Sequence, residues 1–150
     1  MPQSLSFILI HIIFSTKGRL PILDATIRPA LYAYLATVIR HAGCECFRVG
    51  GVADHVHFAV RFTRTDSIAN LVGKLKSAST RWLKLQAPAF ADFAWQRGYA
   101  AFSLGSSEAA RLIHYIDNQQ AHHETRTFQD EYRTFLTKYD VAFDERYVWD

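Results

Sequence analysis

Two histidines separated by one residue, His55 and His57, form the sharpest chemical feature of the sequence. On a β-strand their side chains share one face, because successive residues of a strand point to opposite sides. The other face is then apolar and consists of Val56, Phe58, Val60 and Phe62. Two imidazoles at this spacing can bind one divalent cation. The alternative for an isolated pair is two strand histidines with ordinary hydrogen bonds. The preceding Asp54 could orient one of these histidines or only cap the turn, and we favour the turn.

A second feature lies in the segment 107–122, which we expect to form a helix. Tyr115 and Gln119 are four residues apart and therefore lie on one helix face, which also carries Arg111 and either His122 or His123. The tyrosine phenol has an unperturbed pKa of about 10, so it is a poor nucleophile at neutral pH. It can attack phosphorus when a metal ion polarises the phosphate. The alternative is an amphipathic helix with a tyrosine at its edge.

Together the two features predict a phosphoryl-transfer site. Two histidines and one amide oxygen leave positions on Mg²⁺ or Mn²⁺ free for a phosphate oxygen, whereas zinc favours a third histidine. His122 or His123 could supply that third imidazole, so a zinc hydrolase using His55 and His57 is an alternative. No general base for Tyr115 is evident in the sequence.

The two motifs resemble those of a known family. His55-Val56-His57 is similar to the HUH motif, in which U is a bulky apolar residue, and the segment 115–119, YIDNQ, is similar to the YxxxQ motif of the single-tyrosine HUH transposases. That family comprises small transposases of insertion sequences that move as single-stranded DNA, together with REP-associated tyrosine transposases. The stretches GGVADHVHFAV, FAWQRGYAAFS and YIDNQQAHHETRTFQDEY extend the resemblance over nearly the whole chain.

The resemblance implies specific roles. His55, His57 and Gln119 would hold the metal ion, Mg²⁺ or Mn²⁺. Tyr115 would attack a DNA phosphate to form a 5′-phosphotyrosine link and a free 3′-OH, and the reverse attack would rejoin strands. The family also implies a homodimer, in which the tyrosine helix can complete the partner's site, and recognition of single-stranded DNA through a hairpin.

The charge distribution is consistent with a nucleic-acid partner. The net charge is +3, and residues 61–97 hold seven basic residues against two acids. A basic region of this kind favours an anionic partner, although a solvated helix face is the alternative. Trp95 and Tyr99 could stack on unpaired bases, whereas core packing is the interpretation for Trp82 and Phe102. The predicted phosphate contacts are Lys17, Arg19, Lys74, Lys76, Arg81, Lys84, Arg97 and Arg111.

The elements that must position these residues follow from periodicity and turn signals. Strands are expected over 5–15, 44–50, 55–62 and 99–104, and helices over 27–42, 67–86 and 107–122, with a last amphipathic helix opened by Thr127. Thr26 and Ser106 are the expected N-caps of the first and third helices. The order βαββαβ predicts an α+β, ferredoxin-like sandwich with a central antiparallel sheet, in which the tyrosine lies on added C-terminal helices.

Length and composition set further limits. At 150 residues, 49% hydrophobic and 21% charged, the chain is globular, and we expect one HUH domain over residues 1–150. No apolar run approaches the roughly 20 residues of a membrane span, and the stretch 5–14 is too short for an anchor. The two cysteines, Cys44 and Cys46, are expected to be reduced, which favours a cytoplasmic protein that is nucleoid-associated when bound to DNA. A non-catalytic, ferredoxin-like nucleic-acid-binding module is the alternative function.

Overall fold

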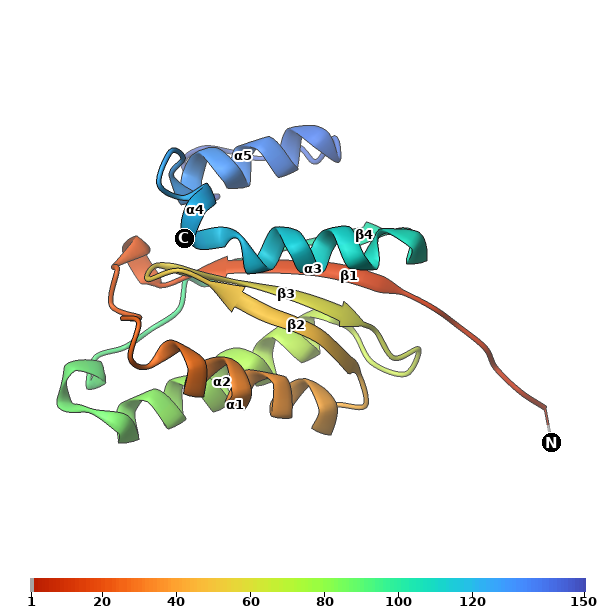
Figure 1. Ribbon diagram of the computed structural model, residues 1–150, viewed down its shortest axis with the longest axis horizontal. Helices are drawn as coiled ribbons and strands as arrows, with labels where there is room; N and C mark the ends of the chain where they lie inside the picture. The colour runs from red at the N-terminus through yellow and green to blue at the C-terminus, as the bar shows by residue number, and fades with distance from the viewer. Residues whose placement is uncertain (1) are drawn as a thin grey trace.

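Four antiparallel strands form one sheet with helices on both faces (Figure 1). The computed structural model describes residues 2–150. The strands are β1 (Leu9–Ser15), β2 (Glu45–Gly51), β3 (His55–Arg61) and β4 (Ala100–Leu104). The helices are α1 (Arg28–His41), α2 (Ile68–Gln86), α3 (Ala109–Asp117), α4 (Gln119–His122) and α5 (Phe128–Lys138), and short 3-10 turns are η1 (Lys17–Arg19), η2 (Pro88–Phe90) and η3 (Ser106–Glu108).

The sheet has the strand order β2-β3-β1-β4, so the two most apolar strands, β1 and β3, lie at its centre. The order β1-α1-β2-β3-α2-β4 confirms the predicted α+β, ferredoxin-like arrangement. The first predicted strand is confirmed only from Leu9 onward. The register pairs Ser15 with His55 and Ile13 with His57, which places the end of β1 beside the histidine pair.

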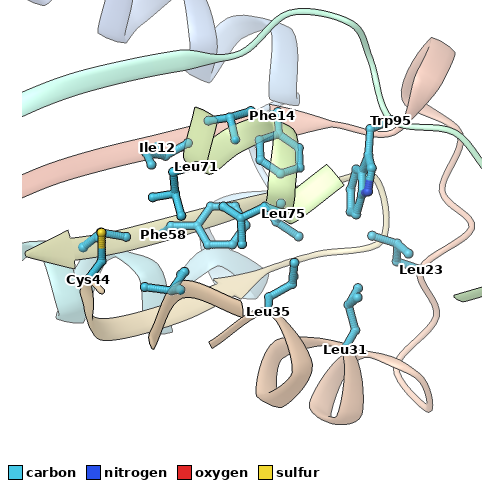
Figure 2. Close-up of a cluster of buried hydrophobic side chains, with 14 of the residues drawn as sticks. Ile12, Phe14, Leu23, Leu31, Leu35, Cys44, Phe58, Leu71, Leu75 and Trp95 are labelled. Atoms are coloured by element: carbon cyan, nitrogen blue, oxygen red, sulfur yellow. The ribbon is translucent and has the colours of Figure 1, made fainter. Parts of the chain in front are cut away.

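Helices α1 and α2 cover one face of the sheet and enclose the main core. The inward side chains of β3, among them Phe58, are fully buried there with Phe14 of β1 and Leu71 and Leu75 of α2 (Figure 2). Burying one such side chain contributes about 1.5–3 kcal/mol. Since strand residues alternate, the same packing fixes His55 and His57 on the opposite face.

The second face is covered by α3, α4 and α5 (Figure 1). Leu112 and Ile116 of α3 pack on Leu9 and Ala59, and α5 packs its own apolar residues on β1 and β4. Helix α3 approaches β2 closely at Gly50, where an added Cβ would lie 2.6 Å from Cγ2 of Ile116. The small residue therefore determines how near the tyrosine helix lies to the sheet.

Three local predictions were wrong. The expected helix over 107–122 is interrupted at Asn118, so that Tyr115 lies on α3 and Gln119 begins α4. Ser106 makes no capping hydrogen bond and belongs to the short turn η3. Thr26 does not cap α1; instead Oδ1 of Asp24 accepts hydrogen bonds from the backbone N–H groups of Thr26 and Ile27.

Two further expectations have clear outcomes. Thr127 caps α5 as expected, because its hydroxyl accepts a hydrogen bond from the backbone N–H of Asp130. Cys44 and Cys46 are both free. Within residues 2–150, every helix is too short or too polar to cross a bilayer.

Candidate active site

The site is built on β3, whose alternation presents His55 and His57 to the layer formed by α3, α4 and α5. Both side chains are completely buried. In each ring Nδ1 points away from the centre of the site and Nε2 points into it. Nδ1 of His55 lies 2.6 Å from Oδ1 of Asp54, and Nδ1 of His57 lies 2.8 Å from Nε2 of His11 on β1. Asp54 therefore orients a histidine and is not only a turn residue.

A buried carboxylate, Glu131 of α5, occupies the centre. Its Oε1 lies 3.3 Å from Nε2 of His55 and 3.0 Å from Nε2 of His57. The same oxygen lies 3.2 Å from Nε2 of His123. Its other oxygen, Oε2, accepts a hydrogen bond from the hydroxyl of Tyr115. One carboxylate thus faces three imidazoles with one oxygen and the phenol with the other.

Gln119 is the remaining polar side chain of this cluster. Its side chain is buried, and Oε1 lies 3.1 Å from Nε2 of His55 and 3.0 Å from Nε2 of His123. Its amide nitrogen donates to Oε2 of Glu131 at 3.2 Å. The interruption of the helix at Asn118 lets Gln119 turn its amide to the histidines while Tyr115, one turn earlier, reaches the carboxylate.

These groups suit a divalent cation. One ligand atom from each of His55, His57, His123 and Glu131 lies within 4.8 Å of all the others. Nδ1 of His123 lies 2.8 Å from the backbone carbonyl of Arg126, so each of the three imidazoles is held at Nδ1 and turned inward at Nε2. Metal-binding histidines characteristically use their outer nitrogen in this way. The donor set therefore fits a bound metal ion.

The electrostatics of the cluster follow from burial and from the carboxylate. Burial alone would raise the pKa of Glu131, but His57, His123 and His55 together hold it well below its usual range, so the group is a carboxylate. Burial would lower the pKa of His55, but hydrogen bonds to Asp54 and Glu131 raise it to about 9. For His57 burial dominates and lowers the pKa.

Tyr115 lies at the edge of this cluster in the same chain. Its ring packs edge-on to that of His57, with 5.8 Å between centroids, and its hydroxyl is 3.3 Å from Nε2 of His122. Burial and the neighbouring Glu131 raise the pKa of the phenol. The hydroxyl therefore carries its proton and directs it at the carboxylate.

An open cleft of about 610 Å³ borders the cluster. Asp54 and His123, which line it, both contact His55, and the arginines Arg28 and Arg126 lie at its walls. We call it the arginine cleft. The carboxylates of Asp54, Glu124 and Asp130 also line this cleft, so its walls carry charges of both signs.

A second cleft, of about 660 Å³, brings together residues that are distant in sequence. It is lined by the predicted phosphate contacts Lys17, Arg19 and Arg97 and by Trp95 and Trp149, and we call it the tryptophan cleft. The Trp149 ring packs 6.4 Å from that of Phe128, which in turn packs 4.7 Å from His55. Only one layer of aromatic side chains therefore separates this cleft from the histidines.

The other predicted phosphate contacts lie elsewhere. Lys74, Arg81 and Lys84 are exposed on α2, on the sheet face opposite the histidines. Nζ of Lys76 donates to the backbone carbonyls of residues 96, 97 and 98 at 2.7, 3.0 and 2.8 Å, so it holds this loop. Arg111 is exposed and pairs with Glu108. Among the candidate stacking residues, Trp95 is buried and Tyr99 is partly exposed.

Sequence reasoning missed Glu131 and His11. Each leaves a signal in the pattern, because each is a polar residue at an apolar position. Glu131 falls within the apolar stripe of α5, three residues after Phe128 and four before Phe135. His11 interrupts the otherwise apolar strand β1. A polar side chain at such a position has to find a partner inside the protein.

Comparison with known proteins identifies a family that this chain matches. Residues 4–119 match the family described as "Transposase IS200 like". The chain is 25% identical over 114 residues to the ISDra2 transposase TnpA of Deinococcus radiodurans, which covers 73% of this chain and 81% of that relative. A crystal structure of a transposase-family protein from Deinococcus radiodurans R1 superposes with a TM-score of 0.61 at 24% identity, over 79% of this chain and 98% of the other.

A further solved structure, of a REP-associated tyrosine transposase bound to a REP hairpin, has a TM-score of 0.60 at 15% identity. The match covers 82% of this chain and 74% of that chain, and it shows a common fold. The family match, by contrast, spans β1 to the start of α4 and includes the histidine pair, Tyr115 and Gln119. The chain therefore belongs to the IS200-like transposase family.

Proposed function

We propose that this transposase cleaves and rejoins single-stranded DNA through Tyr115, with a divalent cation held by His55 and His57. The observation that carries the proposal is the convergence of the Tyr115 hydroxyl, both histidines and the Gln119 amide on one buried carboxylate within a single chain. A cation bound there would polarise the scissile phosphate and stabilise the charge that develops on it.

The chain's own residues supply the remaining steps. Oη of Tyr115 attacks phosphorus, the Oη–P bond forms, and the bond from phosphorus to the 3′ oxygen breaks. The phenol proton passes to Oε2 of Glu131, and the 3′ oxygen takes up a proton from water and leaves as a free 3′-OH. Attack by a 3′-OH on the phosphotyrosine reverses these changes, so rejoining needs no external energy source.

Two side chains are candidates for the oxygen ligand of the cation. Gln119 offers an amide oxygen and Glu131 a carboxylate oxygen, and both face Nε2 of His55. His123 adds a third imidazole, which favours zinc. Mg²⁺ and Mn²⁺ accept oxygen ligands more readily. Metal analysis of protein purified without added metal separates the cases, since tightly held stoichiometric zinc would favour a zinc hydrolase.

We infer that the tryptophan cleft guides the DNA strand. Lys17, Arg19 and Arg97 would contact phosphates, and Trp149 would be the stacking partner of an unpaired base if the base displaced the Arg19 guanidinium, which lies 5.8 Å from the ring centroid. The related structure with a REP hairpin supports a hairpin-bearing strand as the substrate. Lys74, Arg81 and Lys84 would contact a different stretch of the same DNA, because α2 lies on the far side of the sheet.

The test is the covalent intermediate. Incubated with Mn²⁺ and a single-stranded oligonucleotide that contains a hairpin, the wild-type protein should form an adduct that survives denaturing electrophoresis, with the DNA on Tyr115 by mass spectrometry. Tyr115→Phe should abolish the adduct, and the matched control Tyr147→Phe, at an exposed position, should retain it. An adduct with Tyr115→Phe would identify a different nucleophile. Salt-sensitive binding of the oligonucleotide that neither Mn²⁺ nor EDTA changes would favour the non-catalytic binding module.

A further inference from the structure

The side chain of His11 is buried on β1 directly behind the histidine pair. Its relative exposure is 1%, and its Nε2 lies 2.8 Å from Nδ1 of His57. The two rings are stacked, with 5.0 Å between centroids and 26° between planes. The rings of Tyr115 and Phe135 pack edge-on to His11 at 6.1 and 5.1 Å. His11 therefore contacts both a candidate metal ligand and the candidate nucleophile.

Cation binding by His57 determines which nitrogen of each ring carries a hydrogen. Nε2 of His57 faces the cluster, 3.0 Å from Glu131, and can bind a cation only through an unprotonated lone pair. The ring hydrogen then lies on Nδ1 and is donated to His11, which has to accept through its own Nε2. The geometry suits this role, because Nε2 is the His11 nitrogen that lies 2.8 Å from Nδ1 of His57.

We propose that His11 is a positioning residue that fixes His57 in the tautomer whose Nε2 binds the cation. The two other inward-facing histidines, His55 and His123, use oxygen acceptors for the same purpose. A carboxylate at position 11 would bury a further negative charge in the cluster, whereas a neutral imidazole accepts the hydrogen bond without adding charge. The inference rests on the metal site of the proposed function and is independent of strand transfer.

The first test compares two variants by Mn²⁺ titration in calorimetry, with no DNA present. His11→Leu removes the acceptor and should weaken Mn²⁺ binding by about 10- to 100-fold. His11→Gln places an oxygen near the position of Nε2 and should restore affinity to near the wild-type value. Ile13→Val, at a buried β1 position on the same face, is the matched control for a packing change and should bind Mn²⁺ as the wild type does. Wild-type affinity in His11→Leu would overturn the proposal.

A second measurement uses the wild-type chain and does not depend on whether a variant folds. Nitrogen-15 NMR of the imidazoles in the Mg²⁺-loaded protein should show His57 protonated at Nδ1 and His11 unprotonated at Nε2. A His57 hydrogen on Nε2 would refute the assignment. If the wild type bound neither Mg²⁺, Mn²⁺ nor Zn²⁺, this proposal and the proposed function would both fail. Cation binding that is indifferent to position 11 would remove the role of His11 alone.

Discussion

Glu131 converts a pair of strand histidines into a site with two distinct sides. Oε1 faces the three inward imidazoles and Oε2 faces the phenol, so one residue connects the proposed cation site with the proposed nucleophile. Removing a buried group of this kind leaves several polar partners without a hydrogen bond. This lowers the free energy of unfolding more than the loss of one surface contact does.

We expect Glu131→Gln to slow adduct formation by roughly 10²-fold or more, because an amide cannot accept the phenol proton and general bases contribute about 10²–10⁴ in rate. Single-turnover cleavage of a hairpin oligonucleotide measures the effect. Glu45→Gln, an exposed carboxylate on β2 that pairs with Arg61, is the control and should react at the wild-type rate. A Glu131→Gln enzyme as fast as the wild type would exclude the carboxylate from the proton transfer.

Stability of the metal-free protein should fall as pH rises above neutrality. Asp54 and Glu131 raise the pKa of His55 from 6.5 to about 9, so protonated His55 stabilises the fold. That contribution is complete below pH 6.5 and is lost as pH rises through 9, a change of about 3 kcal/mol in the free energy of unfolding. Denaturant melts in EDTA between pH 6 and 10 measure it.

The control for this profile is Asp54→Asn, in which the pKa of His55 is raised less and the decline should be shallower. Burial lowers the pKa of Lys76 to about 8, which contributes a change of opposite sign in both proteins. The difference between the two profiles therefore isolates His55. Identical profiles would show that Asp54 does not support the charge on His55.

At the scale of elements, the distance between α3 and β2 places Tyr115. Gly50 allows the backbone oxygen of Ile116 to come within 3.2 Å of where a Cβ would lie. Because Ile116 is the residue after Tyr115, a shift of α3 at this contact moves the nucleophile with it. The precision of the site therefore depends on a residue without a side chain.

Gly50→Ala should lower the free energy of unfolding by about 1–3 kcal/mol and reduce the rate of adduct formation, because α3 has to move away from β2. The second change Ile116→Ala removes the Cγ2 clash and should recover part of the rate. Gly73→Ala, in α2 with open space around it, is the matched control and should be neutral or stabilising by about 0.4–1 kcal/mol. Thermal melts measure the stability, and gel assays the rate of adduct formation, of Gly50→Ala, the double variant and Gly73→Ala.

The sequence predicted these elements well where periodicity is strong. The alternation in β3 and the apolar stripe of α2 follow directly from burial on one side. The positions of both elements, and the side chains that each turns to the core, were therefore predictable. The break at Asn118 was not, since nothing in the local sequence forbids a helix there. It accompanies the contact of Gln119 with His55, which lies 64 residues away in the chain. Glu131 was missed for the same reason, because its partners are 74 and 76 residues away in the chain.

At the scale of the molecule, one chain contains every group of the proposed site. Tyr115, His57 and Glu131 are in direct contact without a second subunit. The family resemblance implies a homodimer with tyrosine helices that can act on the partner's site, and we propose a dimer whose sites are instead each formed within one chain.

Mixing two inactive variants tests this arrangement. Tyr115→Phe lacks the nucleophile and His57→Ala lacks a metal ligand, so a mixture of the two should remain unable to form the adduct when each site is built from one chain. Light scattering confirms that both variants keep the wild-type mass in solution. Adduct formation in the mixture would mean that the tyrosine of one subunit serves the histidines of the other.

The hydrogen bonds around His55 have one more consequence. With a pKa of about 9, the His55 ring is protonated on both nitrogens at neutral pH. The hydrogen on Nε2 then occupies the position at which a cation would bind. Loading the centre is therefore an exchange, in which an incoming cation expels hydrogen ions into the surrounding buffer. A more alkaline medium therefore favours loading, and a more acidic one opposes it.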